Sequence, residues 1–313
     1  MEQMVVTGAG PVGWTVAEQL AAAGHRVRIL SRTGNGPESS LIQCQAVDVS
    51  DPVTVMKEVD GATAVFHCIH AAYNANAWRK ELPQAEQNIL AAAGSQGAVV
   101  AFPESLYSYS QPDQVMTEAG PRDASGGKRG VRTDLLKARE ASSTPTVSVV
   151  AADFFGPRVL QSHMGERVVP RVIAGQRISV IGSADTLHSF TYVPDLATAL
   201  IAAALDEGVW NTVLHAPTLS AGTQRQMVAA FAAAAGVPPP HVGAVPGWVV
   251  RALGRVQPLM RELAELLYQT ERPFTMSSTA SEKKLGLAPT PLAEAAAATV
   301  NWWRDKSAAD QRG

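Results

Sequence analysis

The chain opens with Met4-Val5-Val6-Thr7-Gly8-Ala9-Gly10-Pro11-Val12-Gly13, and this stretch decides the fold. The apolar run 4–6 predicts a buried first strand, and the glycines after it predict a turn. Apolar residues then recur at helical spacing up to Gly24, and residues 25–30 predict a second strand. Strand, Gly8-x-Gly10-x-x-Gly13, helix and strand form the context in which this motif binds a dinucleotide.

Each residue of the motif has a separate mechanical role. Gly8 permits the tight turn, Gly10 lets the backbone approach a pyrophosphate, and Gly13 lets the helix pack close to the strand. Pro11 suits the first helical position, where an N–H has no intrahelical partner. With Val12 and Gly13 it forms a helix N-terminus that can bind phosphate. The alternative is a chance glycine turn, which the flanking strand, helix and second strand argue against.

The end of the second strand indicates which dinucleotide binds. An NAD site usually has an acid about 20 residues past the glycines, which accepts a hydrogen bond from the ribose 2′-hydroxyl. This chain has Ser31-Arg32 there instead. An arginine without an acid suits a 2′-phosphate, so NADP(H) is favoured over NAD(H) as cofactor. In the alternative interpretation, Arg32 is a solvated loop residue.

Composition excludes several classes of protein. The 313 residues are 46% hydrophobic and 17% charged, with a formal net charge of −2, which argues against a nucleic-acid surface. Cys44 and Cys68 lie in apolar, strand-like runs, which is typical of reduced core thiols and not of a disulfide framework or a metal site. The first strand begins at once, so we expect no signal peptide, and the alanine-rich runs are too short for a membrane span. We therefore expect a cytoplasmic protein without membrane or nucleic-acid partners and without a metal.

Strand-like and helix-like segments alternate through the first half of the chain. Expected strands follow at 41–47, 62–69, 98–102 and 146–151, and expected helices at 51–59, 83–95 and 130–142, with Ser50 or Asp51 as the cap of the first. This alternation predicts an α/β fold, a Rossmann-type doubly wound parallel sheet with right-handed crossovers. Ligands bind outside the carboxyl ends of such strands, so residues just after each strand are the candidates for chemistry.

The pattern changes after Gly156-Pro157. Proline-rich residues 237–240 form a joint, and helices are expected at 248–253, 259–269 and 292–304. We predict a dinucleotide-binding domain over residues 1–157, with about 186–216 returning to it. Residues 158–313 then form mainly a smaller, mostly helical substrate-binding lobe.

With these pieces in place, the sequence resembles the extended or atypical short-chain dehydrogenases/reductases, the group that includes NAD-dependent epimerase/dehydratases. The resemblance covers nearly the whole chain and lies in segments 7–13, 48–49, 67–72, 105–109, 153–157, 189–197 and 284–292. It implies that Asp48-Val49 contacts adenine. Ile69 and His70 follow the fourth strand, where the cofactor ribose or nicotinamide would pass; His70 as a structural histidine is the alternative.

The chain departs from the family at the catalytic residues. The family uses a serine or threonine with Tyr-x-x-x-Lys, in which the tyrosine transfers the proton, the lysine lowers its pKa, and the serine orients the oxygen. Ser105 lies at the serine position, but the expected pair falls on Lys128-x-x-x-Arg132, with Thr133-x-x-x-Lys137 as a second frame. Neither contains tyrosine. The glycine spacing also differs from the three-apart pattern of most members.

Two phenols could replace the missing tyrosine. Tyr107 and Tyr109 lie on the loop after the fifth strand, and either could transfer the proton, with Lys128 or Arg132 depressing its pKa. The alternative is that both tyrosines are packing residues and both cations are solvated.

Further candidates follow other strands. Asp153 suits a cap or turn acceptor better than a base. Tyr73 and Trp78 are candidates to line an aromatic substrate pocket; the alternative is that both are packing residues of the core. His188 stands where relatives often carry a substrate-contacting arginine, and is a weaker candidate.

The favoured function is therefore NADP(H)-dependent oxidoreduction or epimerisation at a secondary alcohol or ketone of a small organic substrate. The alternatives are a redox-neutral cyclase, dehydratase or isomerase on the same fold, in which Lys128 and Arg132 polarise a carbonyl, and a non-catalytic dinucleotide-sensing regulator. A homodimer would be ordinary for such a protein.

Overall fold

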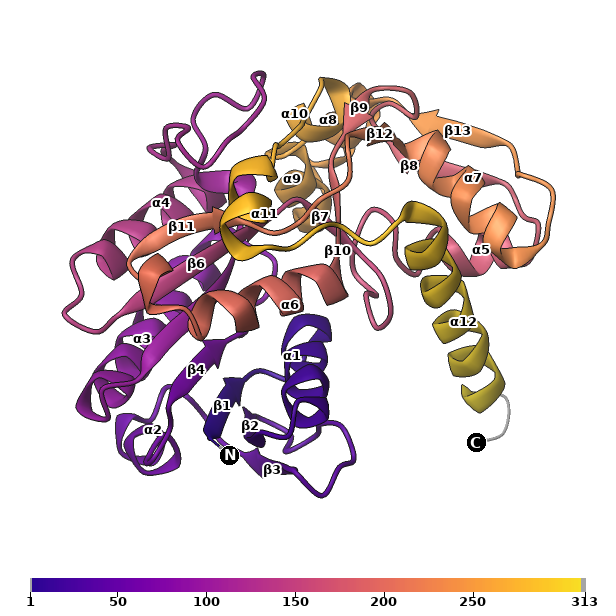
Figure 1. Ribbon diagram of the computed structural model, residues 1–313. Coiled ribbons are helices and arrows are strands. Elements are labelled where there is room, and N and C mark those ends of the chain that lie inside the picture. Colours follow the sequence, from indigo (N-terminus) through magenta and orange to yellow (C-terminus); the bar gives the residue numbers. More distant parts are fainter. Residues whose placement is uncertain (1, 311–313) are drawn as a thin grey trace.

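A seven-stranded parallel sheet forms the centre of the computed structural model, which describes residues 2–310 (Figure 1). Its strands lie in the order β11-β6-β5-β4-β1-β2-β3. They are β1 Gln3–Thr7, β2 Arg26–Ser31, β3 Ile42–Ala46, β4 Ala64–His67, β5 Val99–Ser105, β6 Thr146–Ala151 and β11 Thr212–His215. The predicted Rossmann-type sheet is confirmed.

The register places the switch point of the sheet beside β1. Thr7 at the end of β1 pairs with Leu30 of β2 on one side and His67 of β4 on the other. The chain runs outward from β1 through β2 and β3, then returns past β1 and builds β4, β5 and β6 in the opposite direction. A crevice at the carboxyl ends of β1 and β4 follows from this topology, and it is where such sheets bind ligands.

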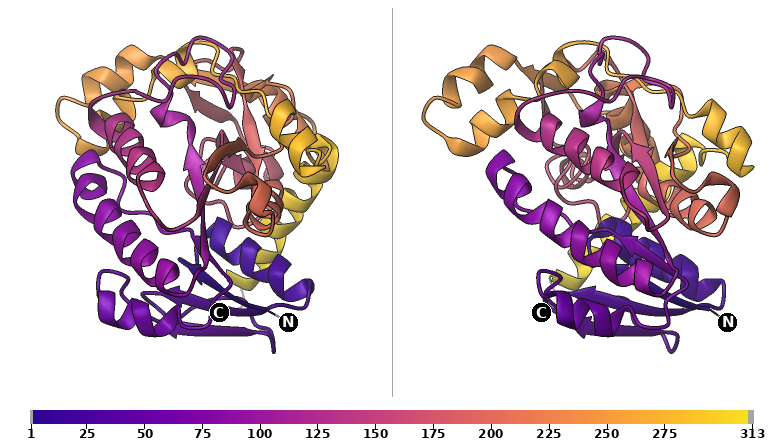
Figure 2. Two further views of the ribbon diagram at one scale, coloured as in Figure 1. Left: turned by 60° about the vertical axis from the view of Figure 1, so that its left-hand side comes forward. Right: turned by 90° about the vertical axis from the view of Figure 1, so that its left-hand side faces the viewer.

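Helices cover both faces of the sheet (Figure 2). On one face α1 (Pro11–Ala22) packs against α6 (Val193–Ala204), and α6 also contacts β5 and β6. On the other face α2 (Pro52–Glu58), α3 (Ala75–Ser95) and α4 (Gly127–Glu140) pack in succession. Asp51 caps α2 by accepting a hydrogen bond from the Val53 N–H, as one of the two predicted caps.

Helix α3 begins eight residues earlier than the sequence pattern predicts. The expected start at Pro83 is wrong: Asn74 caps the helix by accepting from the Ala77 N–H, and Pro83 lies inside it. The residues before the proline bury Trp78 and Leu82, so tertiary packing offsets the hydrogen bond that proline cannot donate.

The second half of the chain builds a separate apolar core from helices and short strands. The core is built by β7 Asp153–Phe155 paired with β10 Phe190–Tyr192, by β8 Ile178–Ile181 paired with β13 Val242–Val245, and by the helices α5 Val169–Ile173, α7 Gln224–Ala235 and α12 Leu292–Asp310. The same half also contains β9 Leu187–His188 paired with β12 Gly222–Thr223, and the helices α8 Gly247–Leu253, α9 Pro258–Ala264, α10 Tyr268–Glu271 and α11 Thr279–Leu285. Two 3-10 turns, η1 (Leu106–Ser108) and η2 (Glu207–Val209), lie elsewhere in the chain. Phe231 of α7 and Trp303 of α12 are buried in this core. The single helix expected at 259–269 is instead two, α9 and α10, because the chain turns at 265–267.

Strand β11 shows that the sheet continues beyond the first half. It pairs with β6 at the edge, and helix α6 precedes it. The segment expected to return to the first domain, residues 186–216, includes α6 and the sheet strand β11. The domain boundaries themselves stay a prediction.

Cys44 and Cys68 are unpaired thiols. Within residues 2–310, no helix has both the length and the apolar character needed to cross a membrane.

Candidate functional site

The glycine turn after β1 is shaped by two of its three glycines. Gly8 has φ +91°, a backbone conformation that favours glycine, and a Cβ there would lie 2.8 Å from the Cys68 carbonyl oxygen. At Gly13 a Cβ would lie 2.0 Å from the Gly8 carbonyl oxygen, so α1 can approach the strand only without a side chain. Both glycines are therefore required by the chain itself.

Gly10 is different, because nothing in the described chain lies within 4 Å of a Cβ built on it. Its φ of −75° is open to any residue, and it is the N-cap of α1 without a side-chain cap. Pro11 follows at the start of the helix, as predicted. The space beside Gly10 and the free N–H groups of the first turn suit a pyrophosphate, so the residues present fit a dinucleotide.

The residues predicted to bind the adenosine end lie together at the ends of β2 and β3. Arg32 is exposed in the turn after β2, and its charge contributes to lowering the pKa of Asp48. The larger cause is hydrogen bonding from Ser50, whose N–H lies 2.9 Å from an Asp48 carboxylate oxygen. Val49 is buried, and its carbonyl accepts from the Asn88 side chain (2.9 Å). Ser31 ends β2 beside Arg32.

His67 ends β4 in the core beside the crevice. Its Nδ1 lies 2.8 Å from the Thr7 hydroxyl, and its Nε2 is buried without a partner in the described part of the chain. Burial, reinforced by the charges of Arg139 and Arg132 and opposed by Glu86, lowers the pKa of His67 to about 4. The ring is therefore neutral at pH 7.

This buried histidine predicts acid sensitivity. Because its pKa is below the value of 6.5 for an unfolded histidine, the unfolded state binds the proton first, and stability falls as the pH drops from about 6.5 to about 4. We expect His67 to contribute about 3 kcal/mol of this loss. Urea unfolding at pH 7, 5.5 and 4 should show a flatter pH dependence for His67→Asn than for wild type; equal slopes would contradict the assignment.

An aromatic cluster follows β4 and β5. The ring of Trp78 stacks on Tyr107 (6.0 Å between centroids) and meets Tyr73 and His70 edge-on (5.9 and 4.8 Å). The Tyr73 and Tyr107 hydroxyl oxygens lie 3.4 Å apart. Burial first, then Arg132, keeps the pKa of His70 below its usual range. Ile69 packs against the core on the α3 face of the sheet.

The expectation that Lys128 or Arg132 depresses a phenol pKa is not met. Burial raises the pKa of Tyr107 well above its ordinary value and raises that of Tyr73 as well. Carboxylates already neutralise both cations. These phenols stay protonated near neutral pH and can donate hydrogen bonds.

Lys128 and Arg132 are not solvated charges. The Lys128 side chain is fully buried, and its Nζ lies 2.6 Å from Glu262 and 2.7 Å from Glu265. The Arg132 guanidinium lies over the Trp78 ring (4.8 Å) and its Nε is 3.5 Å from a Glu104 oxygen. The cluster therefore contains two cations with different partners.

Ser105 ends β5 next to this cluster. Its N–H and its hydroxyl lie 2.7 and 3.3 Å from one oxygen of Glu104. The other Glu104 oxygen accepts from Arg139 (2.9 Å), which also pairs with Glu86. A buried ionic network thus stands behind Ser105.

Tyr109 lies apart from these residues. It is 1% exposed, packs with Met116 and Phe274, and its hydroxyl lies 2.6 Å from His215 Nε2. The prediction that Tyr109 faces the site is corrected, because the turn at 106–108 directs Tyr107 to the aromatic cluster and Tyr109 into a separate core.

Sequence reasoning named Asp153 and His188 separately, but it missed His163 and the cluster that the three form at the start of β7. Asp153 accepts from His188 Nε2 (2.6 Å), and His163 Nε2 lies 3.7 Å from the same oxygen. Burial alone would raise the pKa of Asp153, but His163 and His188 offset it and hold it below its ordinary value. Asp153 is thus a hydrogen-bond acceptor for a histidine side chain and not a cap. His163 lies in an irregular loop, where no spacing signal could have indicated it.

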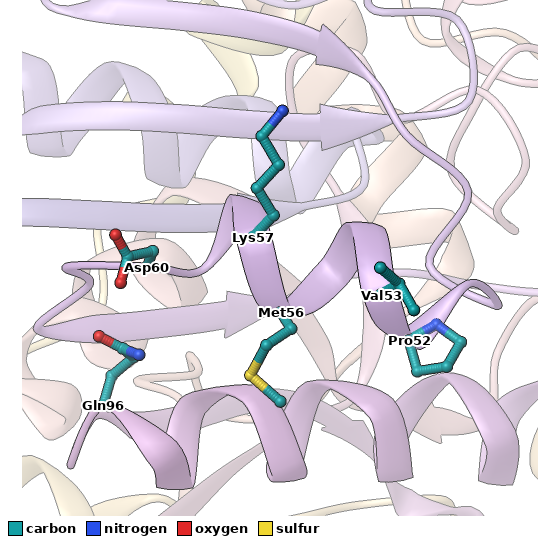
Figure 3. Close-up of a pocket in the computed structure, with 6 residues that line it drawn as sticks. All are labelled: Pro52, Val53, Met56, Lys57, Asp60 and Gln96. Carbon is teal, nitrogen blue, oxygen red and sulfur yellow. The ribbon is translucent and has the colours of Figure 1, made fainter.

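A surface groove elsewhere does not belong to this site. It has a volume of about 620 Å³ and is lined by residues of α2 and the turns after α2 and α3: Pro52, Val53, Met56, Lys57, Asp60 and Gln96 (Figure 3). Asp60 and Gln96 follow the carboxyl ends of those helices, which places them near the amino ends of β4 and β5. This is the edge of the sheet opposite the glycine turn.

Solved structures share this architecture over nearly the whole chain. A Bordetella bronchiseptica enzyme, WbmH, solved in complex with NAD+, is 18% identical with a TM-score of 0.76, covering 97% of this chain and 99% of its own. An epimerase from Methanothermobacter thermautotrophicus is 18% identical with a TM-score of 0.79, covering 100% and 95%. A UDP-glucose 4-epimerase from Thermotoga maritima is 16% identical with a TM-score of 0.75, covering 97% and 99%. No curated protein sequence matches the chain.

The model of one enzyme family matches most of the chain. It is described as the NAD dependent epimerase/dehydratase family, and it matches residues 4–212, from the first strand to the start of the last strand of the sheet. The matched segment includes the glycine turn and all the predicted site residues. The chain therefore belongs to the NAD-dependent epimerase/dehydratase family of enzymes.

Proposed function

We propose that this protein is an NADP(H)-dependent oxidoreductase or epimerase acting on a secondary alcohol or ketone of a small organic substrate. The observation that carries the proposal is Gly10: the chain leaves the space beside it open, at the N-terminus of α1, in a turn whose other two glycines the fold itself requires. A pyrophosphate at this position accounts for a glycine that packing does not demand.

The preference for NADP(H) rests on Ser31 and Arg32. An exposed guanidinium at the end of β2 can meet a 2′-phosphate with paired charged donors. Asp48, the nearby carboxylate, is hydrogen-bonded to Ser50. The proposed cofactor set is therefore Gly8, Gly10, Pro11, Val12, Gly13, Ser31, Arg32, Asp48, Val49, Ile69 and His70.

We expect Arg32→Ala to weaken NADPH binding about tenfold or more and to leave NADH binding unchanged, because a charge-assisted contact with a phosphate is lost. Isothermal titration calorimetry with both nucleotides on both proteins measures this. NADH binding is the internal control. Wild-type protein that binds NADH as tightly as NADPH would refute the NADP(H) preference.

The chemistry that the cofactor supplies is hydride exchange at the nicotinamide. The Ser105 hydroxyl donates to Glu104, and its oxygen is proposed to accept a hydrogen bond from the substrate hydroxyl. The Tyr107 phenol, kept protonated by burial, donates a hydrogen bond to it. Arg132 lies under the same cluster, on the ring of Trp78. Burial first, and His188 in addition, lower the pKa of His163 against the opposing charge of Asp153; His163 is then a neutral acceptor for a proton.

The raised phenol pKa values favour a second candidate. Without a tyrosine that ionises, the cleft could carry out a redox-neutral isomerisation, dehydration or cyclisation. The protein could equally be a regulator that binds the dinucleotide without turnover. An NADPH-consumption assay across aldehydes and ketones separates these. Turnover supports the oxidoreductase, and tight cofactor binding without turnover supports the second candidate. A cytoplasmic location and a homodimer stay predictions of the sequence.

A further inference from the structure

Lys128 holds an unusual set of partners for a fully buried ammonium group. Its Nζ lies 2.6 Å from a Glu262 carboxylate oxygen, 2.7 Å from a Glu265 carboxylate oxygen and 3.2 Å from the Glu262 carbonyl. Two carboxylates therefore surround one ammonium. Both come from residues more than 130 positions away in the sequence, at the end of α9.

The Glu265 carboxylate also occupies the N-terminus of α4. Its second oxygen accepts the Lys128 backbone N–H at 2.8 Å. A Cβ at Gly127 would lie 2.1 Å from this oxygen, so the carboxylate approaches the backbone only because residue 127 is glycine. A backbone N–H, an ammonium group and a helix dipole together form an anion site, which here binds a carboxylate of the same chain.

The segment that supplies these carboxylates is anchored by apolar residues at its two ends, Val250 of α8 and Leu266 and Leu267 after α9. Helices α8 and α9 form a hairpin at the outer edge of the molecule (Figure 2), and no residue of α9 is buried. Trp248 and Val256 of the hairpin segment are 69% and 79% exposed. Between these anchors, the contact of α9 with Lys128 of α4 is ionic, in contrast to α12, which buries Trp303. Ionic contacts of this kind can be exchanged for those of a ligand.

The anion site adjoins the aromatic cluster. The Lys128 ammonium lies 4.9 Å from the centre of the Tyr73 ring, and Tyr73 contacts Trp78. The Trp78 indole N–H is buried without a hydrogen-bond acceptor in the described part of the chain. A buried donor without a partner is rare in folded proteins, and an anionic ligand bound between Lys128 and this cluster would supply an acceptor. This observation is independent of the Lys128 contacts.

We propose that the substrate carries a compact anionic group, a carboxylate or a phosphate, that replaces Glu265 and Glu262 on Lys128 and the α4 N-terminus. Helix α9 then moves away from α4 as the substrate enters. The inference rests on the proposed function, since it assigns the anion to the substrate of that cleft.

The test uses inorganic phosphate and acetate as probes in isothermal titration calorimetry. In the E262Q/E265Q variant the competing carboxylates are gone, and we expect at least about tenfold tighter binding of one probe than in wild type, because the competent state is fully populated. The probe whose affinity rises more in the variant shows whether the group is a phosphate or a carboxylate. The affinity for UDP should rise less than the affinity for the better of the two probes. Adding Lys128→Gln to this variant should abolish the gain, and Lys128→Arg should retain part of it.

Two further measurements separate structure from binding. Asp185→Asn removes an exposed carboxylate that pairs with Arg225, and it should leave probe binding at the wild-type level. Trypsin cleavage at the exposed Arg255 in the hairpin turn should accelerate severalfold when the favoured probe is added to wild type. Equal probe affinity in wild type and E262Q/E265Q, or a gain that survives Lys128→Gln, overturns the inference. NADPH binding to the same variants reports on the dinucleotide site alone. If the probes contradict the inference while NADPH still binds, the anion site is wrong and the proposed function stands.

Discussion

Gly10→Ala is expected to fold as wild type does and to bind NADPH at least about a hundredfold more weakly. The φ of −75° at Gly10 admits alanine, and the added methyl group meets no atom of the described chain within 4 Å. The methyl group instead occupies the space through which a pyrophosphate reaches the N–H groups of α1. Each charge-assisted hydrogen bond lost there is worth about 1.5–3 kcal/mol. Calorimetric titration and urea unfolding of the same sample measure both properties.

Gly13→Ala is the matched control. Alanine favours a helix interior over glycine by about 1 kcal/mol, so propensity alone predicts stabilisation. The Cβ at this position would lie 2.0 Å from the Gly8 carbonyl oxygen, and we expect a clear loss of stability instead. A Gly10→Ala protein that binds NADPH normally would remove the observation on which the proposed function stands.

Arg139→Gln should destabilise the protein by about 3–5 kcal/mol. The guanidinium is 3% exposed and bonds to both Glu86 and Glu104 and to the Ser148 hydroxyl (3.1 Å). Removing it leaves two buried carboxylates with too little positive charge around them, which costs far more than losing a surface pair. Burial alone would raise the pKa of Glu86; the Arg139 charge offsets this and lowers it. Chemical unfolding at pH 7 measures the change.

Arg225→Gln provides the comparison for Arg139→Gln. Arg225 makes two hydrogen bonds to Asp185 (2.6 and 2.8 Å), but both side chains are about half exposed or more. Such a pair contributes about 1 kcal/mol or less. If both variants lost the same stability, the buried network would not have the structural role assigned to it.

The sequence predicted the parts of the site that depend on local pattern. Residues 4–13 and the strand ends at Arg32, Asp48 and Ser105 follow from apolar runs and glycines within a few positions of one another. It failed where distant residues decide the outcome. The sequence predicted a helix start at Pro83 because it did not show the burial of Trp78. It left Lys128 either catalytic or solvated, because its partners Glu262 and Glu265 lie far away in the sequence.

The sequence by itself determined the Rossmann-type sheet, its glycine turn and the position of the carboxyl ends, since the apolar pattern of strands and the chemistry of turns are local properties. Only the tertiary structure decided which charged groups meet. It joined Arg139 to Glu86 and Glu104, Asp153 to His188, and Lys128 to the α8–α9 hairpin. The reason is physical: a charge is buried only where the fold brings it a partner, and that partner can come from any part of the chain.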